Sequence, residues 1–352
     1  MERLNLIDKI DQLSHIGQTT KGICRKSGTR EDADARGLVI SWMLNAGMSI
    51  QQDEYNNLIG TLSGKQDLPP IVVGSHIDTV ETAGKYDGVL GVLAGIEAAD
   101  TLRGHLNHPL QVVVFNDEEN SMSGSIGYCV DKPNIRVFLE LHVEQGPVLD
   151  LQQTDIGVVQ GIVGQRRCHF TMYGQENHAG TTPMSMRDDA LVKTAPIISY
   201  VYEKALEAGG LVATVSQLEV SPNAFSVVPG QVDFTIQVRD LSADTMEEFV
   251  EDVCKKFDLR YDIAHASEPT ECDCSVMNII SDTANDLGLS FMELPSRASH
   301  DAQNFTFCPM GMIFVPSIDG VSHSPDEKTT DEMCYNGLNV LTETIRRIDG
   351  EA

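Results

Sequence analysis

Histidine and carboxylate side chains follow the apolar segment IVVGSH at a spacing that suits metal chemistry. His76 closes the segment, Asp78 comes two residues later, and Asp87 lies eleven residues on in KYDGVLG. A strand that ends in Gly–Ser–His projects its imidazole from the carboxyl edge of a parallel sheet, where such folds place their sites. Gly88 allows a tight turn that keeps Asp87 near that edge, and Asp78 is spaced to orient the ring of His76. The plain alternative is a capping aspartate and a histidine satisfied within the fold.

Two adjacent glutamates follow the next apolar segment, LQVVVF. They occur in the run Asn116–Asp117–Glu118–Glu119. Neighbouring carboxylates at one sheet edge repel each other unless a cation or a proton intervenes. A metal supplies that cation, so one glutamate can bind it while the other stays free to carry a proton. A solvated acidic loop is the alternative for an isolated Glu–Glu pair.

Two more histidines occupy similar positions. His142 lies in ELHVEQGPVLD at the end of a third apolar segment, and His323 lies in SHSPDE after the apolar segment GMIFV. Two histidines, one aspartate and one glutamate from separate strand ends, with a fifth ligand, are enough for two divalent metals that share a carboxylate. The sequence contains neither a nucleophile elbow nor a phosphate-binding glycine loop that would compete with this interpretation.

The composition restricts the class of protein. The 352 residues include 25 basic and 52 acidic side chains, a formal charge of −27, and 41% of them are hydrophobic. This length predicts roughly two domains of about 150 residues each, and the acidic balance argues against nucleic-acid binding. No segment approaches the ~18 apolar residues of a membrane helix, and the start of the chain lacks the apolar core of a secretory signal. We therefore expect a soluble, cytoplasmic protein with neither nucleic-acid nor membrane partners.

The first third of the chain has a strand–helix–strand order. Segments 71–73, 110–115 and 138–143 read as buried strands, and 88–103 has the apolar spacing of a helix. This order favours an α/β fold, in which helices cover the faces of a mostly parallel sheet.

The middle of the chain changes character. Strands and helices alternate there, with strands expected at 168–173, 211–220 and 232–238 and helices at 188–205 and 245–257. A helix at 275–287 and a buried strand at 311–315 follow. The simplest interpretation is a catalytic domain made of residues 1–160 and 271–352, interrupted by a smaller α+β domain at 161–270.

Taken together, the motifs resemble those of the hydantoinase/carbamoylase amidases of the M20 metallopeptidase-like clan. That group includes N-carbamoyl-L-amino-acid hydrolases, β-ureidopropionases and allantoate amidohydrolases. The matching segments run in family order from about residue 28 to 330: GSHIDTVETAGKYDGVLGVLAGIE, FNDEEN, ELHVEQGPVLD, VGQRR, NHAGTTPMSMRDDAL, SVVPG with VRD, SHDAQ and SHSPDE. ELHVEQGP together with NHAGTTPM separates this group from the peptidases of the clan.

The resemblance implies a Zn-peptidase-like catalytic domain that holds two divalent metal ions per subunit. His76 and His323 would be terminal ligands of the two metals, and Asp87 would bridge them. Glu119 would bind one metal and His142 the other. The mixed nitrogen and oxygen ligands suit zinc or manganese, and also cobalt or nickel.

The resemblance also implies catalytic and substrate-binding residues. Glu118 would be the general base, and His178 of the inserted domain would polarise a ureido carbonyl and stabilise its oxyanion. Arg239 would grip the carboxylate of a small anionic ureido substrate with two hydrogen bonds. The other expected substrate contacts are Gln145, Arg167, Ser226 and His300. The inserted domain would form a homodimer and a lid, with some contacts reaching the partner's site.

The chain departs from the family pattern in three places. Family members usually carry an asparagine thirteen residues before the arginine of VRD, where this chain has Ser226, and Asn223 is offset by three positions. Between SGSIGY and FLELHVEQGP only about ten residues remain of a longer, partly helical stretch. The usual glycines before His300 are replaced in the segment SRAS, so Arg297 would add charge to the substrate pocket.

The expected reaction is hydrolysis of a linear ureido C–N bond in an N-carbamoyl amino acid or allantoate. Glu118 and the two metals would activate a water molecule, and the carbamate released would break down to carbon dioxide and ammonia. Two alternatives remain open. One is an aminoacylase or dipeptidase of the same clan, and the other is a metal-binding relative with impaired catalysis.

Overall fold

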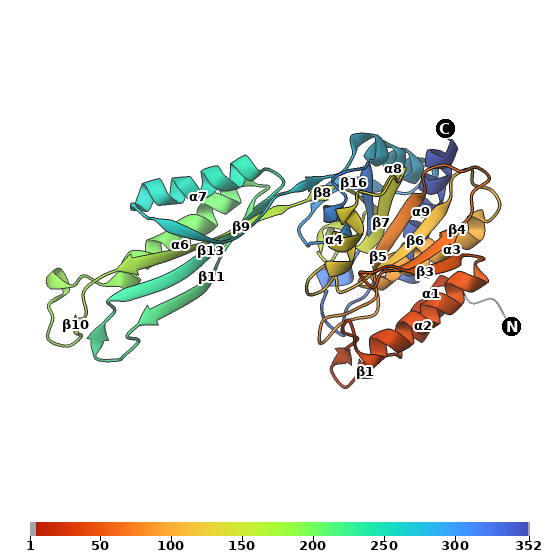
Figure 1. The fold of residues 1–352 in the computed structure, drawn as a ribbon. Coiled ribbons are helices and arrows are strands. Elements are labelled where there is room, and N and C mark those ends of the chain that lie inside the picture. The colour runs from red at the N-terminus through yellow and green to blue at the C-terminus, as the bar shows by residue number, and fades with distance from the viewer. Residues whose placement is uncertain (1–4, 351–352) are drawn as a thin grey trace. The chain divides into compact units, whose positions relative to one another are not determined.

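The computed structural model describes residues 5–350, which divide into two compact units (Figure 1). The first unit contains the chain up to Ile162 and again from Glu271 onward, and the second contains Val163–Thr270. The boundaries expected from the sequence, 160/161 and 270/271, lie within two residues of these. Each unit has a hydrophobic core of its own.

A nine-stranded sheet forms the centre of the first unit. Parallel pairing joins its four central strands, namely β17 (Met310–Val315), β7 (Val137–Val143), β5 (Ile71–His76) and β6 (Leu110–Phe115). The flanking strands are β15 (Thr270–Glu271), β8 (Ile156–Ile162), β16 (Phe291–Ser296), β4 (Leu58–Leu62) and β3 (Ser49–Gln52). The β17–β8, β6–β4 and β4–β3 pairs are antiparallel. The prediction of a mainly parallel sheet is confirmed for its centre, and the sheet is mixed towards its edges.

Helices cover both faces of this sheet. One face carries α1 (Leu6–Ser14), α2 (Arg30–Asn45), α3 (Val89–Leu102), α8 (Cys274–Asp286) and α9 (Asp331–Gly350). The other carries α4 (Ser123–Val130), α5 (Val148–Gln152) and the 3₁₀ turn η2 (Asp301–Asn304). Burial on both faces explains why every residue of β5 and β7 is buried and why both strands begin with an apolar run. Within residues 5–350, no helix is long and apolar enough to cross a membrane.

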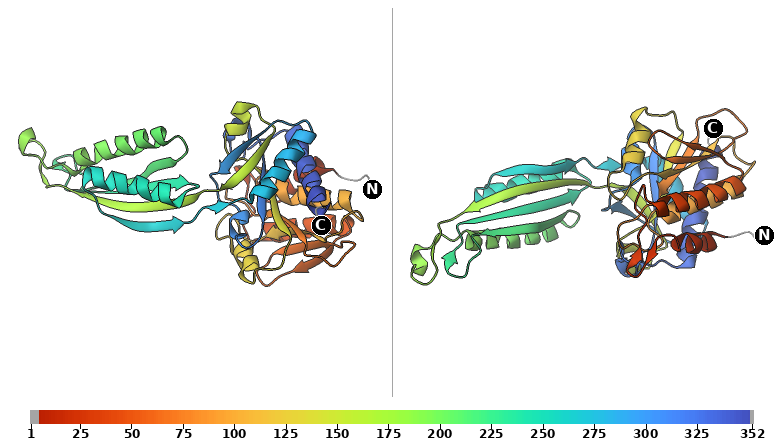
Figure 2. Two further views of the ribbon diagram at one scale, coloured as in Figure 1. Left: turned by 90° about the horizontal axis from the view of Figure 1, so that it is seen from above. Right: turned by 60° about the horizontal axis from the view of Figure 1, so that its bottom comes forward.

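The second unit is a four-stranded antiparallel sheet with two helices on one face (Figure 2). Its elements follow the order β9 (Gly164–Tyr173), α6 (Ala190–Ala208), β11 (Val212–Ser221), β13 (Gln231–Asp240), α7 (Ala243–Phe257) and β14 (Tyr261–Ser267). The strands lie side by side as β11-β13-β9-β14. Inward-facing residues of β9 and β13, such as Phe170 and Phe234, form the core beneath α6 and α7.

A short two-stranded ribbon extends this second unit at one end. It consists of β10 (Asn177–His178) and β12 (Val227–Val228). Figure 1 shows β10 at the end of the unit opposite the one where the chain enters through β9.

Candidate metal and catalytic site

The carboxyl ends of the central strands of the first unit meet at one edge of the sheet. The strand register places His76 beside the last residue of β6 and His142 beside the penultimate residue of β17. Glu118 and Glu119 follow β6 directly, and His323 lies in the loop after β17. Four segments far apart in the sequence therefore contribute to one cluster, as is typical of the carboxyl edge of a parallel sheet.

Asp87 lies at the centre of this cluster. Its Oδ1 is 3.2 Å from Nε2 of His142 and 3.8 Å from Nε2 of His76, while its Oδ2 is 3.2 Å from Nε2 of His323. The same nitrogen of His323 is 3.6 Å from Oε2 of Glu119. Two groups of metal-ligand type thus share Asp87: His76, Asp87 and His142 form one, and Asp87, Glu119 and His323 form the other.

The donor atoms fit divalent cations. Oδ1 of Asp87 is buried and has no hydrogen-bond partner among residues 5–350, although it faces two imidazole nitrogens. A buried carboxylate oxygen without a partner needs an explanation, and a bound cation provides one. Imidazole and carboxylate donors together suit zinc, manganese, cobalt or nickel.

Without metal, the cluster holds its protons on the histidines. Burial alone would lower the pKa of His76, but carboxylates, Glu118 foremost, raise it well above the usual value. The hydrogen bond to Asp87 raises the pKa of His323 to about 9. Burial opposes ionisation of Asp87, yet the neighbouring imidazoles of His142 and His323 hold its pKa well below the usual value. Metal ions would displace these imidazole protons, so metal affinity depends on pH.

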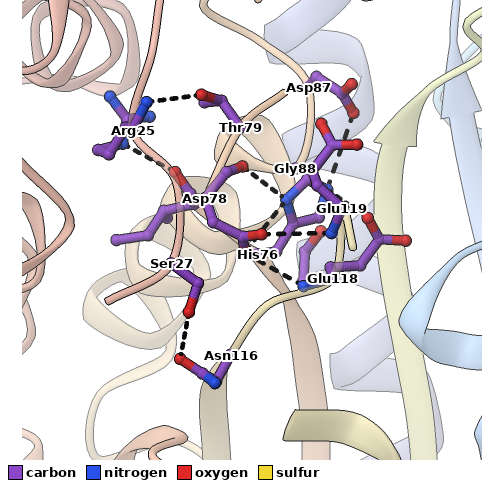
Figure 3. A network of polar contacts seen from close by, with 12 residues as sticks. Arg25, Ser27, His76, Asp78, Thr79, Asp87, Gly88, Asn116, Glu118 and Glu119 are labelled. Carbon is purple, nitrogen blue, oxygen red and sulfur yellow. Dashed lines mark hydrogen bonds and ion pairs between the residues drawn. The ribbon is translucent and has the colours of Figure 1, made fainter. Parts of the chain in front are cut away.

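Gly88 permits the close approach of Asp87 to His76 (Figure 3). Gly88 is the N-cap of α3 and has a φ of +66°, which favours glycine. A Cβ atom at this position would lie 2.4 Å from Nε2 of His76. The tight turn predicted from the sequence is therefore present, and it brings the backbone against the face of an imidazole.

Glu118 lies beside the two ligand groups without belonging to either (Figure 3). Its side chain is 7% exposed, and its Oε2 is 3.6 Å from Nε2 of His76. Burial raises the pKa of Glu118 well above the usual value, even though His76 opposes the shift. A buried carboxyl group whose pKa is raised is suited to general acid–base chemistry.

Asp78 orients His76, but not through its carboxylate. Nδ1 of His76 lies 3.0 Å from the backbone oxygen of Asp78 and 3.8 Å from the nearer carboxylate oxygen. The carboxylate instead accepts hydrogen bonds from the backbone N–H groups of Glu118, at 3.4 Å, and Glu119, at 3.2 Å. Asp78 therefore positions the loop that carries both glutamates as well as the ring of His76.

Two further residues contact the cluster from neighbouring loops. Gln145 was expected to bind substrate, and its Nε2 lies 3.0 Å from Oδ2 of Asp87 and 3.3 Å from Nε2 of His323. Glu327 was missed, although it belongs to the motif SHSPDE. Its Oε2 accepts hydrogen bonds from the backbone N–H groups of Tyr86 and Asp87, and burial raises its pKa to about 7.

His300 was expected to contact substrate, and the structure buries it beside His142. Its side chain is 1% exposed, and its ring packs against that of His142 with 4.5 Å between centroids and against Phe314 with 5.6 Å. Burial, followed by the nearby charge of His142, holds its pKa well below the usual value. The ring therefore packs against a side chain of the cluster, and its contact with substrate stays a prediction.

His178 and Ser226 are neighbours at the ribbon end of the second unit. The backbone N–H of Ala179 donates to the carbonyl oxygen of Ser226 at 2.7 Å. Nδ1 of His178 accepts from the backbone N–H groups of Gly180 at 3.0 Å and Thr181 at 3.1 Å. Because Nδ1 serves as an acceptor, a neutral His178 carries its proton on Nε2, where it can be donated to a ligand.

Arg167 and Arg239 lie together near the other end of the same sheet. The register pairs Arg167 with Gln237 and Arg239 with Gln165, which places all four on the face opposite the helices. With its amide oxygen turned towards Arg239, Gln237 accepts from Nε at 2.7 Å and from Nη2 at 2.8 Å. Burial, and next the charge of Arg167, lowers the pKa of Arg239. This pair of cations suits an anionic group.

The second unit therefore separates its predicted substrate contacts into two sets. The ribbon with His178 and Ser226 lies beyond Gln231, the first residue of β13, and Arg239 is the ninth residue of that strand. Eight steps of ~3.3 Å put about 26 Å between the two ends. One subunit does not bring His178 and Arg239 to the same small molecule.

Comparisons with known proteins agree with these features. The sequence pattern of peptidase family M20/M25/M40 matches residues 72–347. The chain is 35% identical to the N-carbamoyl-L-amino acid amidohydrolase of Geobacillus stearothermophilus over 97% of both chains, and 32% identical to the allantoate amidohydrolase of Bacillus subtilis over 98% of this chain and 97% of that protein.

A solved structure has the same fold. The hydantoinase/carbamoylase family amidase of Burkholderia multivorans superposes with a TM-score of 0.88 at 30% identity, and 97% of each chain is covered. The alignment with the Geobacillus enzyme spans 396 positions, more than the 352 residues of this chain, so that relative carries internal segments that are absent here. The chain belongs to peptidase family M20/M25/M40 and, within it, to the hydantoinase/carbamoylase amidases, which are hydrolases of carbon–nitrogen bonds other than peptide bonds.

Proposed function

We propose that this chain is a metal-dependent amidohydrolase that cleaves the linear ureido C–N bond of an N-carbamoyl amino acid or of allantoate. The observation that carries the proposal is Asp87, which two groups of ligand type share, with the protonatable carboxyl group of Glu118 beside them. The names of the relatives, N-carbamoyl-L-amino-acid amidohydrolase and allantoate amidohydrolase, support a ureido substrate.

Two divalent ions would be held by the two groups that share Asp87. His76 and His142 would complete one group, and Glu119 and His323 the other. Such ions, when bound, lower the pKa of a water molecule and polarise a carbonyl group. The protein's part is to keep the five side chains oriented, with Asp78, Glu327 and Gly88 shaping the loops around them.

Glu118 would move the proton of the reaction. Its carboxylate takes a proton from the attacking water as the oxygen bonds to the ureido carbon. It then returns that proton to the departing nitrogen as the C–N bond breaks. Burial favours the protonated form of Glu118, which is the form needed for the second step.

The second unit would bind the rest of the substrate. Nε2 of His178 is a hydrogen-bond donor and suits the developing oxyanion. Arg239, with Arg167 next to it, suits the substrate carboxylate, because a guanidinium group binds a carboxylate with two parallel hydrogen bonds. Ser226 stands beside His178 in place of the family's asparagine and has a shorter side chain with which to reach the substrate.

The separation of these contacts supports a homodimer with composite sites. Because about 26 Å of β13 lies between the ribbon and Arg239, His178 and Arg239 of one subunit would serve two different substrates. A second copy of the chain would supply the missing set to each site. Closed two-fold dimers are the commonest arrangement that exchanges equivalent surfaces in this way.

A surface of the second unit fits such a dimer. Strand β11 lies at one edge of the sheet, with its outer backbone groups available to a further strand. Helix α6 packs next to it and exposes an apolar stripe of large side chains at helical spacing: Leu191, Ile198, Tyr202 and Leu206. We assign the dimer contact to this surface, which we call the α6–β11 surface.

Ammonia release tests the proposed reaction. Purified, metal-loaded protein is incubated with allantoate, N-carbamoyl-β-alanine, several N-carbamoyl-L-amino acids and, with amino-acid release scored instead, a dipeptide. We expect turnover of a ureido substrate and its loss in Glu118→Gln. Turnover of the dipeptide alone would identify a peptidase, and silence across the panel from a dimer with two metals bound would refute catalysis at this site.

Mixing two inactive variants tests the composite site. His178→Ala and Arg239→Ala are each expected to be inactive as homodimers. After they are mixed and their subunits exchanged, each heterodimer would contain one site with both residues intact. Because half of the dimers would be heterodimers with one working site of two, activity should return to about a quarter of the wild-type value. No recovery after confirmed exchange would contradict a site shared between subunits.

A further inference from the structure

His300 packs directly on a predicted metal ligand, although it belongs to neither of the two groups that share Asp87. Its ring meets that of His142 edge-on, with 4.5 Å between centroids and an interplanar angle of 62°. The ring of Phe314, which pairs with His142 in the β17–β7 register, also packs against His300 with 5.6 Å between centroids. The ring of His142 is therefore packed against the ring of His300, and this packing limits the rotation of His142 about χ2.

A hydrogen-bond chain determines where His300 carries its proton. The hydroxyl of Ser296 donates to the backbone oxygen of Ala298 at 2.8 Å. The oxygen of the same hydroxyl lies 2.8 Å from Nε2 of His300. Because its only hydrogen is donated to Ala298, this oxygen accepts a hydrogen bond from Nε2 of His300. His300 consequently carries a hydrogen on Nε2, and its orientation follows from that of Ser296.

His142 has a matching arrangement. Its Nδ1 lies 2.9 Å from the backbone oxygen of Val143 and donates to it, so Nε2 carries the lone pair. That nitrogen accepts from the backbone N–H of Gly88 at 3.1 Å and faces Oδ1 of Asp87 at 3.2 Å. The backbone contacts select the tautomer, and the ring of His300 holds the plane of the imidazole.

Glu140 ties the loop of His300 to the strand of His142. This buried carboxylate lies two residues before His142 on β7 and accepts from the backbone N–H of Ala302 at 3.0 Å and from the hydroxyl of Ser75 at 3.0 Å. The segment that follows His300 is thus bonded to β7 itself. Displacement of His300 relative to His142 would break a buried, charge-assisted hydrogen bond.

We propose that Ser296 and His300 are positioning residues for the reaction: through their hydrogen bond they hold the imidazole of His142 in the orientation that its metal requires. This inference rests on the proposed metal site. It gives His300 a role beside the substrate contact expected from the sequence, and it gives a role to Ser296 in a segment where the family pattern of glycines is altered.

Metal affinity, measured separately from activity, tests this proposal. Metal-free full-length protein is titrated with Zn²⁺ against a chelating dye, and its Co²⁺ form is examined by visible absorption. Ser296→Ala removes the acceptor and leaves no large cavity, while His300→Phe keeps a ring but removes the donor. Thr283→Val is the matched control, because Thr283 is equally buried and donates only within α8, to the oxygen of Ile279.

We expect one of the two Zn²⁺ affinities to fall by about 10- to 100-fold in Ser296→Ala and His300→Phe, as is typical when an outer-shell partner of a histidine ligand is lost. The other affinity should stay unchanged, one set of Co²⁺ bands should shift, and Thr283→Val should behave as wild type. Circular dichroism identifies a variant that fails to fold, in which case Ser296→Ala decides the question alone.

Two results would overturn the inference. Two wild-type affinities and unaltered Co²⁺ bands in folded Ser296→Ala would show that the chain does not position His142. A wild-type protein that binds no divalent metal would remove the metal site, and with it both this inference and the proposed function. Wild-type protein with two bound metals but no activity on any ureido substrate would refute the function and leave the positioning role standing.

Discussion

The replacement Gly88→Ala isolates the contact between α3 and His76. Gly88 has a φ of +66°, and its added Cβ would lie 2.4 to 2.6 Å from three atoms of the His76 ring. Normal contact is ~3.5 Å or more, so the ring or the turn must move by about 1 Å. Metal–ligand distances tolerate only ~0.2 Å. The group formed by His76, Asp87 and His142 should therefore lose its metal.

Backbone strain has to be separated from this displacement. A residue with a side chain at such a φ costs ~1–3 kcal/mol wherever it occurs. Gly104 provides the control, because its φ is +78° and no heavy atom of the described residues lies within 4 Å of the point that an added Cβ would occupy. Gly104→Ala should lower the thermal midpoint through backbone strain alone, by less than Gly88→Ala, and leave metal binding and turnover intact.

The assay combines metal stoichiometry, thermal unfolding and ammonia release for both variants. Gly88→Ala should bind one metal tightly instead of two and lose turnover. The affinity for the second metal should fall by more than the ~10- to 100-fold that is typical when an outer-shell partner is lost. If Gly88→Ala binds two metals with wild-type affinity, the crowding at His76 does not control the site and the reasoning from the turn is refuted.

Three other changes probe the remaining parts of the site, and a fourth probes the dimer. Glu118→Gln should retain both metals and lose at least ~100-fold in turnover, because a general base contributes about that much; full activity would exclude Glu118 as the base. The pKa of His323 is raised to about 9 in the metal-free protein. The contribution of protonated His323 to stability is therefore complete below pH ~6.5 and is lost as the pH rises through about 9. The thermal midpoint of the metal-free protein should fall over this range, and His323→Asn should abolish that fall. Glu327→Ala leaves two backbone N–H groups of the Asp87 loop without an acceptor, at ~1–3 kcal/mol each, and should lower both stability and metal affinity, measured by unfolding and titration. Tyr202→Glu on the α6–β11 surface should give a monomer in light scattering and reduce turnover, whereas an intact, active dimer would place the contact elsewhere.

Apolar periodicity was sufficient for the elements that are buried on both faces. The expected strand at 110–115 coincides with β6, and the expected helix at 88–103 differs from α3 by one residue at each end. Some elements with a solvent-exposed face were missed. Strand β14 is exposed along nearly its whole length, and α2 and α9 interleave charged with apolar residues, so their apolar residues do not form an unbroken run.

The candidate metal ligands could be found from the sequence because each sits at the end of an apolar strand or in the loop that follows one. Parallel strands have their carboxyl ends at one edge of the sheet and so bring such residues together, independently of the conformation of the loops between the strands. The supporting residues could not be found in this way. Glu327 and Ser296 act through backbone groups and hydroxyls, and which of these lie within hydrogen-bonding distance depends on loop conformations that no periodicity encodes.

Local sequence therefore determined the chemical groups available to this protein. They are the imidazoles and carboxylates at strand ends, together with Gly88, where a side chain would clash with His76. Tertiary structure alone decided the geometry of that chemistry. It buried His300 against His142, and it placed His178 and Arg239 at opposite ends of one sheet. The physical reason is that motif order records which residues are present, whereas distance and burial arise only when long-range packing brings separate segments into contact.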